Sequence, residues 1–394
     1  MIKVSIVLFL VFFNIINANQ LKLKKVLALS RHNVRTPLTE NLERVTPYEW
    51  NIWDDKAGCL TKKGALLESY IAEYFSMWLK DEELLPKKCP EVNSVYIYSN
   101  TKQRTKLSAI EFAKAAFKDC KVPVHFKNIT TMDPTFNPII HNATDAFKSI
   151  IREEMQKRID ATDLKDAYLE LNKILNFENS KMCKEDGACD LATDKTKIVS
   201  EVGYEPNVDG PLFIGNAVVD AFIMSFFEGK PLKDVAWGKI IDEEQWKLLS
   251  KITKANQDVR FNLTNGYNDF AGPLLKLISE YLLNDVHYKL IYLVGHDSNL
   301  NPVMNALGIK PFVLPNQFEP YPIGGKIVFQ KWSDGKDYLK LEYIYQSWLQ
   351  LREGTVLNFN NPPEKVVLEL KGCPIDEKGL CPWDDFVTIL KQFE

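Results

Sequence analysis

The sequence lacks an excess of charge of either sign, and beyond its first residues it lacks an apolar run long enough to span a membrane. It carries 49 Lys and Arg against 52 Asp and Glu, a net charge of -3. This balance argues against a basic nucleic-acid footprint, so any attraction for an anionic ligand has to be local to one cleft. We therefore expect neither a nucleic-acid partner nor a membrane partner.

Histidine is scarce, and no two cysteines form a Cys-x-x-Cys pair. The five histidines are scattered along the chain: His32, His125, His141, His287 and His296. Zinc sites in proteins usually combine closely spaced cysteines and histidines. The sequence therefore argues against a zinc centre, and we expect no metal and no cofactor.

The first residues read as a secretory signal. A basic head at residues 1–3 precedes an apolar run at residues 4–16 and a small residue, Ala18, suited to cleavage. A membrane anchor is the alternative, but about 13 apolar residues are too few where roughly 20 are needed. We expect a signal peptide at residues 1–18 and a periplasmic or secreted protein. Three Asn-x-Thr triplets also fit a glycosylated eukaryotic protein and leave the host open; they start at Asn128, Asn142 and Asn262.

Seven cysteines in an exported chain favour disulfide bonds, and their odd number leaves one thiol unpaired. Short spacings suit locally closed loops, which suggests pairing between neighbours in the sequence. The expected pairs are Cys183–Cys189, Cys373–Cys381 and, as the third, Cys89–Cys120, with Cys59 left free.

Three apolar runs predict strands that are buried on both faces of a sheet. They cover residues 23–30, 94–99 and 288–295. Helical patterns with one apolar face follow the first two runs. This alternation is typical of an α/β fold with a mostly parallel sheet flanked by helices. Further sheet-like runs lie at 325–329, 339–345 and 365–370.

The middle of the chain has a different pattern. Residues 133–255 contain charged helical patterns, an apolar helix at 216–228 and little strand signal. We interpret this region as a helical insertion into an α/β core that is formed by residues 19–132 and 256–394. Because there is no repeat, low-complexity tract or flexible linker, we expect the two parts to be tightly joined.

The segment Arg31-His32-Asn33-Val34-Arg35 directly follows the first expected strand and places one imidazole between two guanidiniums. Imidazole, with an ordinary pKa near 6.5, is available as the neutral base at neutral or mildly acid pH. Guanidinium forks match phosphate oxygens bidentately. The segment therefore predicts an anion site with a nucleophile inside it, and a phosphoryl group as the guest.

Two further polar clusters follow expected strands. Arg104 comes shortly after the strand at 94–99, and His296-Asp297 directly follows the strand at 288–295. Taken singly, such residues are more often a solvated arginine or an ordinary loop histidine. In open α/β sheets, however, ligands bind beyond the carboxyl ends of the strands. Since all three clusters occupy that position, we expect them to share one crevice.

Over nearly its full length the chain resembles the histidine acid phosphatase family and, within it, the bacterial periplasmic glucose-1-phosphatases. The family resemblance is carried by SRHNVRTPL at 30–38 and GHDSN at 295–299. Most of the family has glycine after the nucleophilic histidine, whereas this chain has Asn33, as the subgroup does. The resemblance implies the histidine phosphatase fold. Subgroup segments are LTKKG at 60–64, DPTFNPII at 133–140, GPLFIGNAVVDAF at 210–222, VAWG at 235–238, PIGGKIVFQKW at 322–332 and GCPIDEKGLCP at 372–382.

The resemblance also implies a mechanism of two phosphoryl-transfer steps. His32 attacks phosphorus to form a phosphohistidine, and Asp297 gives a proton to the leaving alcohol. A carboxyl beside so many cations keeps its proton only with burial or a phosphate dianion nearby, so we expect activity to be best at acid pH. No metal ion is needed, because fixed donors surround the phosphate oxygens. The expected phosphate-binding residues are Arg31, Arg35, Arg104 and His296.

The implied activity is that of an exported acid phosphatase acting on small phosphate monoesters, above all glucose 1-phosphate. We expect Glu228, at the end of the helix at 216–228, to bond sugar hydroxyls at the pocket mouth and to repel heavily phosphorylated ligands. The alternative for Glu228 is a solvated residue at a helix end. The resemblance is also compatible with a homodimer.

Three other functions compete with this one. A broader phytase-like phosphatase would act on inositol hexakisphosphate. A phosphosugar-binding protein would need the arginines but neither His32 nor Asp297, so the presence of both favours an enzyme. A mutase of the same superfamily is disfavoured, because such enzymes are typically cytoplasmic and this chain carries an export signal.

Overall fold

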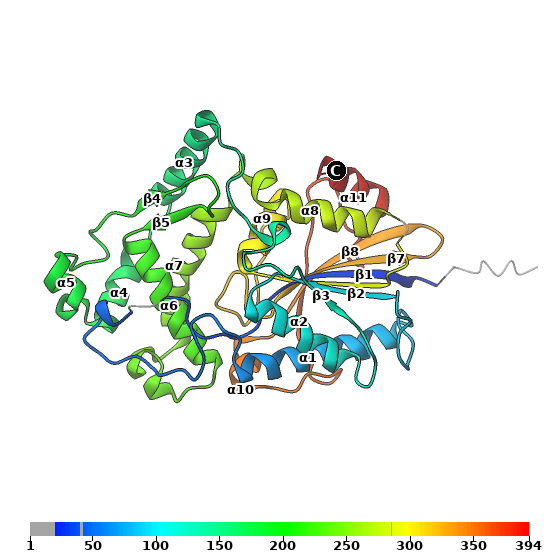
Figure 1. The fold of residues 1–394 in the computed structure, drawn as a ribbon, viewed down its shortest axis with the longest axis horizontal. Coiled ribbons are helices and arrows are strands. Elements are labelled where there is room, and N and C mark those ends of the chain that lie inside the picture. Colours follow the sequence, from blue (N-terminus) through cyan, green and yellow to red (C-terminus); the bar gives the residue numbers. More distant parts are fainter. Residues whose placement is uncertain (1–19, 40–41, 285, 394) are drawn as a thin grey trace, which may run out of the picture.

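A computed structural model describes residues 20–39, 42–284 and 286–393. The signal peptide expected at residues 1–18 lies outside these residues. Within them, a mixed sheet of eight strands carries helices on both faces, and a second, mainly helical part lies beside it (Figure 1). The α/β class expected from the sequence is confirmed.

Eight strands form the main sheet: β1 (Lys22–Arg31), β2 (Val95–Ser99), β3 (Val124–His125), β6 (Leu290–Gly295), β7 (Lys326–Ser333), β8 (Asp337–Tyr345), β9 (Glu364–Val367) and β10 (Leu380–Pro382). Their order is β10-β8-β7-β1-β6-β2-β3, and β9 also pairs with β8. The strands from β1 to β3 in this order run parallel, whereas those from β7 to β10 pair antiparallel. The parallel strands β1 and β6 are therefore neighbours at the centre.

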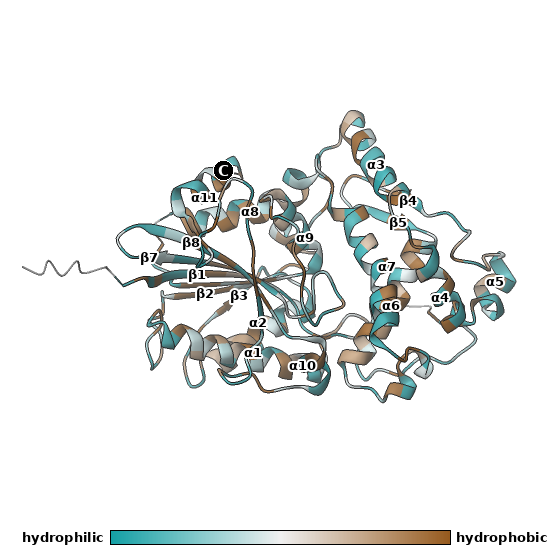
Figure 2. Cartoon of the chain, turned by 180° about the vertical axis from the view of Figure 1, so that it is seen from behind, coloured by the Kyte–Doolittle hydropathy of each residue, from teal (hydrophilic) through white to brown (hydrophobic). Residues whose placement is uncertain are grey.

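The two faces of the sheet are covered by different helices. One face packs against α1 (Lys62–Asp81) and α2 (Gln103–Ala116), and the other against α8 (Tyr267–Leu283), α9 (Asp297–Ala306) and α11 (Trp383–Leu390) (Figure 1). Successive side chains of a strand point to opposite faces. In β1, Val26 and Ala28 join the α1 and α2 side, and Leu27 and Leu29 join the α8 side. Brown, hydrophobic residues accordingly concentrate along the central strands (Figure 2).

The helical part has its own core, in which α6 is central. Its elements are α3 (Asp145–Asp160), α4 (Lys165–Leu175), α5 (Lys181–Asp186), β4 (Lys197–Val199), β5 (Asn207–Asp209), α6 (Pro211–Phe227) and α7 (Glu243–Phe261). The short helix α10 (Trp348–Glu353) contacts α6 from the other part. The division of the chain at residues 133 and 255 stays a prediction, and residue 255 lies within α7.

Six cysteines pair in the combination expected from their spacing. The disulfides are Cys89–Cys120, Cys183–Cys189 and Cys373–Cys381, and Cys59 is free. The first joins the segment after α1 to the segment after α2, the second lies at α5, and the third ties β10 to the preceding loop. In the part of the chain that the structure describes, no helix is both long and apolar enough to cross a membrane.

Candidate active site

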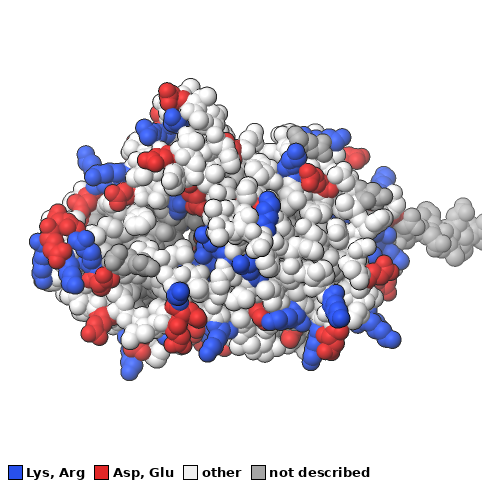
Figure 3. All heavy atoms as spheres, viewed as in Figure 1, with Lys and Arg blue, Asp and Glu red and all other residues white. Residues whose placement is uncertain are grey.

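A cavity of about 290 Å³ opens where the ends of β1 and β6 face α6 and α7. Blue, basic atoms gather at the hollow between the two parts of the molecule (Figure 3). Residues from the ends of β1 and β6 and the start of α2 form what we term the strand side: Arg31, His32, Arg35, Arg104, His296 and Asp297. Residues mainly from α6 and α7 form what we term the helix side: Glu205, Asn216, Asp220, Thr253, Asn256, Gln257 and Arg260.

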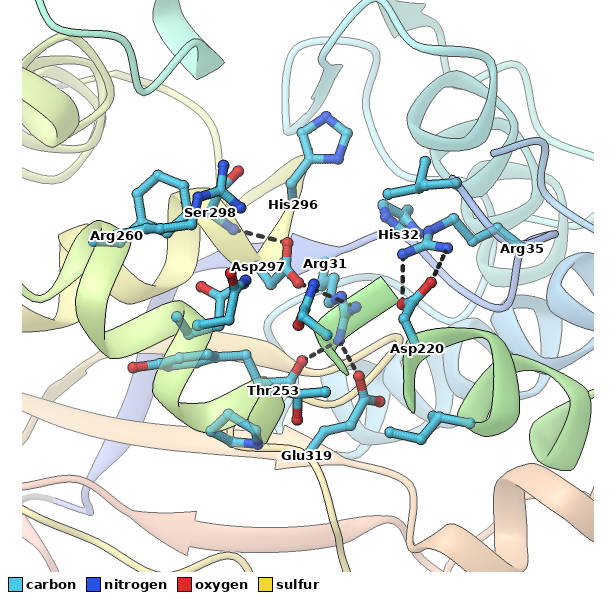
Figure 4. Close-up of a pocket in the computed structure, with 18 of the residues that line it drawn as sticks. Arg31, His32, Arg35, Asp220, Thr253, Arg260, His296, Asp297, Ser298 and Glu319 are labelled. Carbon is cyan, nitrogen blue, oxygen red and sulfur yellow. Dashed lines mark hydrogen bonds and ion pairs between the residues drawn. The ribbon is translucent and has the colours of Figure 1, made fainter. Parts of the chain in front are cut away.

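The strand side brings together the three clusters that the sequence separates. In the parallel pairing of β1 and β6, Arg31 lies opposite Gly295. The next residue of each strand, His32 and His296, therefore lies beside the other at the same edge of the sheet. The imidazole centroids of His32 and His296 are 5.4 Å apart. Arg104 reaches the same place from α2, with its Nη2 3.4 Å from Nδ1 of His296. Figure 4 shows both histidines at the cavity, with His32 next to Arg35.

His32 is held with one particular nitrogen available. Its backbone N–H donates to the Gly295 carbonyl oxygen at 3.0 Å, and its Nδ1 lies 2.9 Å from the Asn33 carbonyl oxygen. A carbonyl oxygen can only accept, so Nδ1 carries the proton and Nε2 keeps the lone pair. Burial, reinforced by the charge of Arg104, lowers the pKa of His32 well below its usual value. The ring is therefore a neutral nucleophile even at acid pH.

Arg31 is fixed by two carboxylates. Its Nη1 donates to Glu319 Oε1 at 2.8 Å, and its Nη2 lies 3.2 Å from Asp297 Oδ2 (Figure 4). Burial acts to lower the pKa of Arg31, but Asp297 and Glu319 outweigh it and raise that pKa. Arg31 is thus a buried side chain that stays positively charged.

Arg35 connects the strand side to the helix side. Its Nη1 and Nη2 donate to the two carboxylate oxygens of Asp220 in α6, at 2.9 and 2.8 Å (Figure 4). Such a two-pronged pair fixes the plane of the guanidinium as well as its position. For Arg104, burial and the charge of Arg35 lower the pKa to about 10, so it too remains charged at acid and neutral pH.

Each of the three strand-side arginines has one N–H donor without a partner. Among the described residues, the Nε–H groups of Arg31, Arg35 and Arg104 are buried and have no hydrogen-bond partner. A buried donor without a partner costs about 1–3 kcal/mol. The three guanidinium charges around one neutral imidazole fit an oxyanion as the ligand.

Asp297 is the carboxylate of the strand side. It begins α9, and its Oδ1 accepts from the Ser298 backbone N–H at 2.9 Å. Burial acts to raise the pKa of Asp297, but the charges of Arg31 and Arg35 and the Ser298 bond outweigh it and lower that pKa. Without a ligand, Asp297 is therefore an anion except at strongly acid pH.

A buried ion pair lies beneath the segment that carries His32. Glu68 Oε1 of α1 is 3.5 Å from Lys326 Nζ of β7, and both side chains are fully buried. Glu68 also accepts from Asn33 Nδ2 at 3.1 Å and from the Tyr292 hydroxyl at 2.6 Å. Gly64 allows α1 to approach closely, since a Cβ there would lie 2.1 Å from the Val34 carbonyl oxygen. The asparagine that replaces the family's glycine is thus part of this support.

The helix side holds mostly neutral polar groups. Three side-chain amides, from Asn216, Asn256 and Gln257, line it together with the hydroxyl of Thr253. Among the seven residues of this side Arg260 is the one cation, and its Nη2 lies 3.0 Å from Glu205 Oε2. Burial raises the pKa of Glu205, although Arg260 opposes it. This surface offers both donors and acceptors, with its cation already paired.

The carboxylates of the cavity form ion pairs with arginines. The pairs are Asp297 and Glu319 with Arg31, Asp220 with Arg35, and Glu205 with Arg260. Across residues 20–39, 42–284 and 286–393, no group of three or more His, Cys, Asp or Glu side chains is arranged to hold a metal ion.

Glu228 does not line the cavity. It caps the C-terminal end of α6, where its Oε2 accepts from the Thr61 hydroxyl at 2.7 Å. Asp220, which does line the cavity, lies about 12 Å earlier along the helix axis, since each residue of an α-helix rises by about 1.5 Å. The expected position at the pocket mouth is therefore corrected: that end of α6 meets the start of α1, and the carboxylates that line the helix side are Glu205 and Asp220.

Four charged residues of the cavity are not among those singled out from the sequence: Glu205, Asp220, Arg260 and Glu319. Only Asp220 had a local signal, because it lies within the 210–222 segment and four residues after Asn216, on one face of a helix. The other three reach the cavity through long-range packing, which no local pattern marks.

Comparison with known proteins agrees with this geometry. A family model described as "Histidine phosphatase superfamily (branch 2)" matches residues 22–185. The chain is 42% identical to the glucose-1-phosphatase of Salmonella typhimurium over 379 residues, which is 94% of this chain and 92% of that protein. It is 41% identical to the glucose-1-phosphatase of Providencia rettgeri, over 95% of this chain and 92% of that one.

A solved phytase structure has the same fold. The phytase from Citrobacter braakii superimposes with a TM-score of 0.86 at 27% identity, covering 95% of this chain and 98% of the phytase. The chain is therefore similar both to glucose-1-phosphatases and to phytases.

Proposed function

This chain is a phosphatase that belongs to the histidine phosphatase superfamily, branch 2, and we propose that it hydrolyses glucose 1-phosphate through a phosphohistidine on His32. One observation carries the proposal: a neutral imidazole, protonated on Nδ1, stands among three guanidiniums, of which those of Arg31 and Arg35 are buried. An imidazole with a free lone pair at the centre of an oxyanion site is suited to attack on phosphorus.

In the first step, Nε2 of His32 attacks phosphorus, and the bond from phosphorus to the leaving oxygen breaks. The arginines and His296 donate to the equatorial oxygens, where the charge of the transition state lies. The bond between Nδ1 and the Asn33 carbonyl oxygen fixes the ring in this tautomer throughout. The sugar oxygen leaves with the electron pair and needs a proton.

Asp297 supplies that proton in our proposal. Its pKa is low in the free protein because of Arg31 and Arg35. A phosphate dianion placed against the same arginines offsets their charge and raises the pKa of Asp297, so that it carries a proton in the complex at acid pH. In the second step the carboxylate takes a proton from water, which attacks phosphorus and releases His32.

The helix side supports the choice of a small sugar phosphate over a polyphosphorylated one. Amide and hydroxyl groups bond sugar hydroxyls in both directions, as donors and acceptors. Glu205 and Asp220 place carboxylates beside the leaving group, and Glu205 already balances the charge of Arg260. Further phosphate groups on the substrate would therefore meet carboxylates and no unpaired cation on this side, which disfavours phytate.

We also propose that the protein acts outside the cytoplasm. Three disulfide bonds are typical of proteins from an oxidising compartment. The basic and apolar residues expected to form a signal peptide at 1–18 support the same conclusion.

Relative rates on two substrates test the proposed function. We expect kcat/KM to be higher for glucose 1-phosphate than for inositol hexakisphosphate at each of several pH values from acid to neutral. A preference for inositol hexakisphosphate at every pH would favour the phytase-like alternative. Tight binding of phosphate with no turnover of either ester would contradict an enzyme altogether.

A further inference from the structure

The ring of His296 lies between two different neighbours. Asn100 Nδ2 is 2.8 Å from its Nε2, and Arg104 Nη2, which like any guanidinium nitrogen can only donate, is 3.4 Å from its Nδ1. The contact with Asn100 is the shorter one and lies within the usual hydrogen-bond range, so it decides which ring nitrogen accepts. Asn100 is fully buried and does not line the cavity, whereas Arg104 does. Nε2 therefore faces the protein interior, and Nδ1 lies on the side of the ring next to a phosphate-site arginine.

The amide of Asn100 can adopt only one orientation here. Its Oδ1 accepts from the backbone N–H of Thr101 at 2.7 Å and from that of Asp133 at 3.1 Å. A flipped amide would turn its NH₂ group toward these two N–H donors and leave them unpaired inside the protein, at a cost of about 1–3 kcal/mol each. The NH₂ group must therefore point at His296, where it can only donate.

The ring that receives this bond is neutral. Burial, together with the surrounding cations, lowers the pKa of His296 well below its usual value. A neutral imidazole has one proton, and the nitrogen that accepts from Asn100 cannot carry it. The nearby backbone N–H of Asn299, in the first turn of α9, is bonded to the His296 carbonyl oxygen at 3.0 Å. The cations that lower the pKa are Arg104, Arg35, Arg31 and Lys102.

We propose that Asn100 is a positioning residue that holds the proton of neutral His296 on Nδ1, so that this nitrogen donates to the phosphoryl group. The opposite tautomer would aim a lone pair at the anion and repel it. Asn100 touches neither the substrate nor the reacting atoms and acts through His296. The functional part of this inference rests on the proposed phosphatase activity, but the tautomer itself does not.

The tautomer can be read directly by NMR of the ligand-free protein with ¹⁵N-labelled histidine. Only five histidines contribute signals, and His32→Asn and His296→Asn variants assign the two buried rings. We expect His296 to show a protonated, pyrrole-type Nδ1 and an unprotonated, pyridine-type Nε2. The reverse pattern would overturn the proposal. Because no substrate is present, the result stands apart from the question of which ester is hydrolysed.

The variant Asn100→Asp tests the consequence for catalysis. The new carboxylate keeps the oxygen that accepts from Thr101 and Asp133, but its second oxygen attracts a proton to Nε2 of His296 and raises the pKa of that ring. Below the raised pKa, the charged ring still donates through Nδ1. Above it, the neutral ring keeps its proton on Nε2, so Nδ1 can no longer donate.

We therefore expect the ratio of kcat/KM between Asn100→Asp and the parent to be near one at low pH. It should fall on the order of tenfold to hundredfold as the pH rises toward neutrality, the usual effect of losing a hydrogen bond to a charged group. A ratio that does not depend on pH would overturn the proposal.

Thr101→Val is the matched control. It removes a hydroxyl that bonds the Thr131 carbonyl oxygen and, at 3.3 Å, Asn100 Oδ1, but it keeps the two backbone N–H groups that hold Oδ1 and the bond from Asn100 Nδ2 to His296. We expect its kcat/KM ratio to the parent to be independent of pH. The same pH-dependent loss in this variant would mean that the effect is structural, and the proposal would fail. A parent protein that hydrolyses no phosphate ester, yet shows the expected tautomer, would contradict only the proposed function.

Discussion

The two sides of the cavity are built differently. On the strand side, Arg31, His32, Arg35 and His296 are buried, and only Arg104 and Asp297 are half-buried. On the helix side, the groups stand on α6, α7 and a loop, and most of them are half-buried, with the side chain of Arg260 17% and that of Glu205 29% exposed. The strand side is therefore the more buried and the more strongly cationic of the two, and the helix side is the more open.

This difference separates two tasks. Fixed donors around a phosphoryl group stabilise the transition state without reorganising, which requires the rigid arrangement of the strand side. Selection among leaving groups requires hydrogen bonding and charge, which open helix-side residues provide without disturbing the nucleophile. Changes on the strand side should therefore lower the rates for glucose 1-phosphate and for phytate alike, and changes on the helix side should alter the ratio between these two substrates.

Apart from loss of the nucleophile itself, the largest effect is expected from Asp297→Asn. Loss of the proton donor should lower kcat for glucose 1-phosphate by about 10²–10⁴-fold, the usual contribution of a general acid. An ester with a nitrophenolate leaving group needs little protonation and should lose much less. Steady-state kinetics on both esters measure the contrast. An equal loss on both would contradict the assignment of Asp297 as the acid.

The pH dependence of kcat should share this origin. Asp297 has to hold its proton in the complex, so kcat for glucose 1-phosphate is expected to fall as the pH rises through the pKa that it has there. His32 is no obstacle at acid pH, because burial lowers its pKa and keeps it neutral. The Asp297→Asn variant should lack this fall. A parent rate that keeps rising above neutrality would contradict the account.

A smaller effect is expected on the helix side. Glu205→Gln removes the carboxylate that pairs with Arg260 and should raise the rate on phytate relative to glucose 1-phosphate by about tenfold, as expected for one repulsive charge. Glu228→Gln is the matched control, since Glu228 bonds Thr61 away from the cavity. The ratio of kcat/KM values reports the result. An unchanged ratio in Glu205→Gln, or an equal change in the control, would remove Glu205 as the selecting residue.

The smallest effect on the choice between the two substrates is expected from Glu68→Gln. This variant should change the free energy of unfolding. It leaves the buried Lys326 without its anion and should lower the free energy of unfolding by about 3 kcal/mol. Asp186→Asn, which breaks an exposed pair with Arg44, should cost less than about 1 kcal/mol. Urea unfolding measures both. Equal costs would show that the Glu68 pair does not support the strand side.

Much of the strand side could be predicted from the sequence because its residues follow strands directly. Arg31 and His32 come at the end of β1, and His296 and Asp297 at the end of β6. Once the strands are recognised as parallel and buried, their carboxyl ends must meet at one edge of the sheet. The positions of these residues therefore depend on local patterns and one general rule.

The helix side could not be predicted in the same way. Glu205 and Arg260 come from a loop and from α7, and only the packing of the helical part brings them to the cavity. Glu228 was placed wrongly because a position in the sequence near an apolar helix says nothing about which end of that helix reaches the cavity. The direction of α6 follows from tertiary packing, which periodicity does not encode.

The central claim is that His32 becomes covalently phosphorylated during turnover. Rapid quenching of the enzyme with a substrate labelled in its phosphate group tests it most directly. We expect a base-stable, acid-labile phosphoenzyme that maps to residue 32 and disappears in His32→Ala together with turnover. A labelled protein that persists in His32→Ala, or turnover by the parent with no labelled intermediate at any time, would contradict the account.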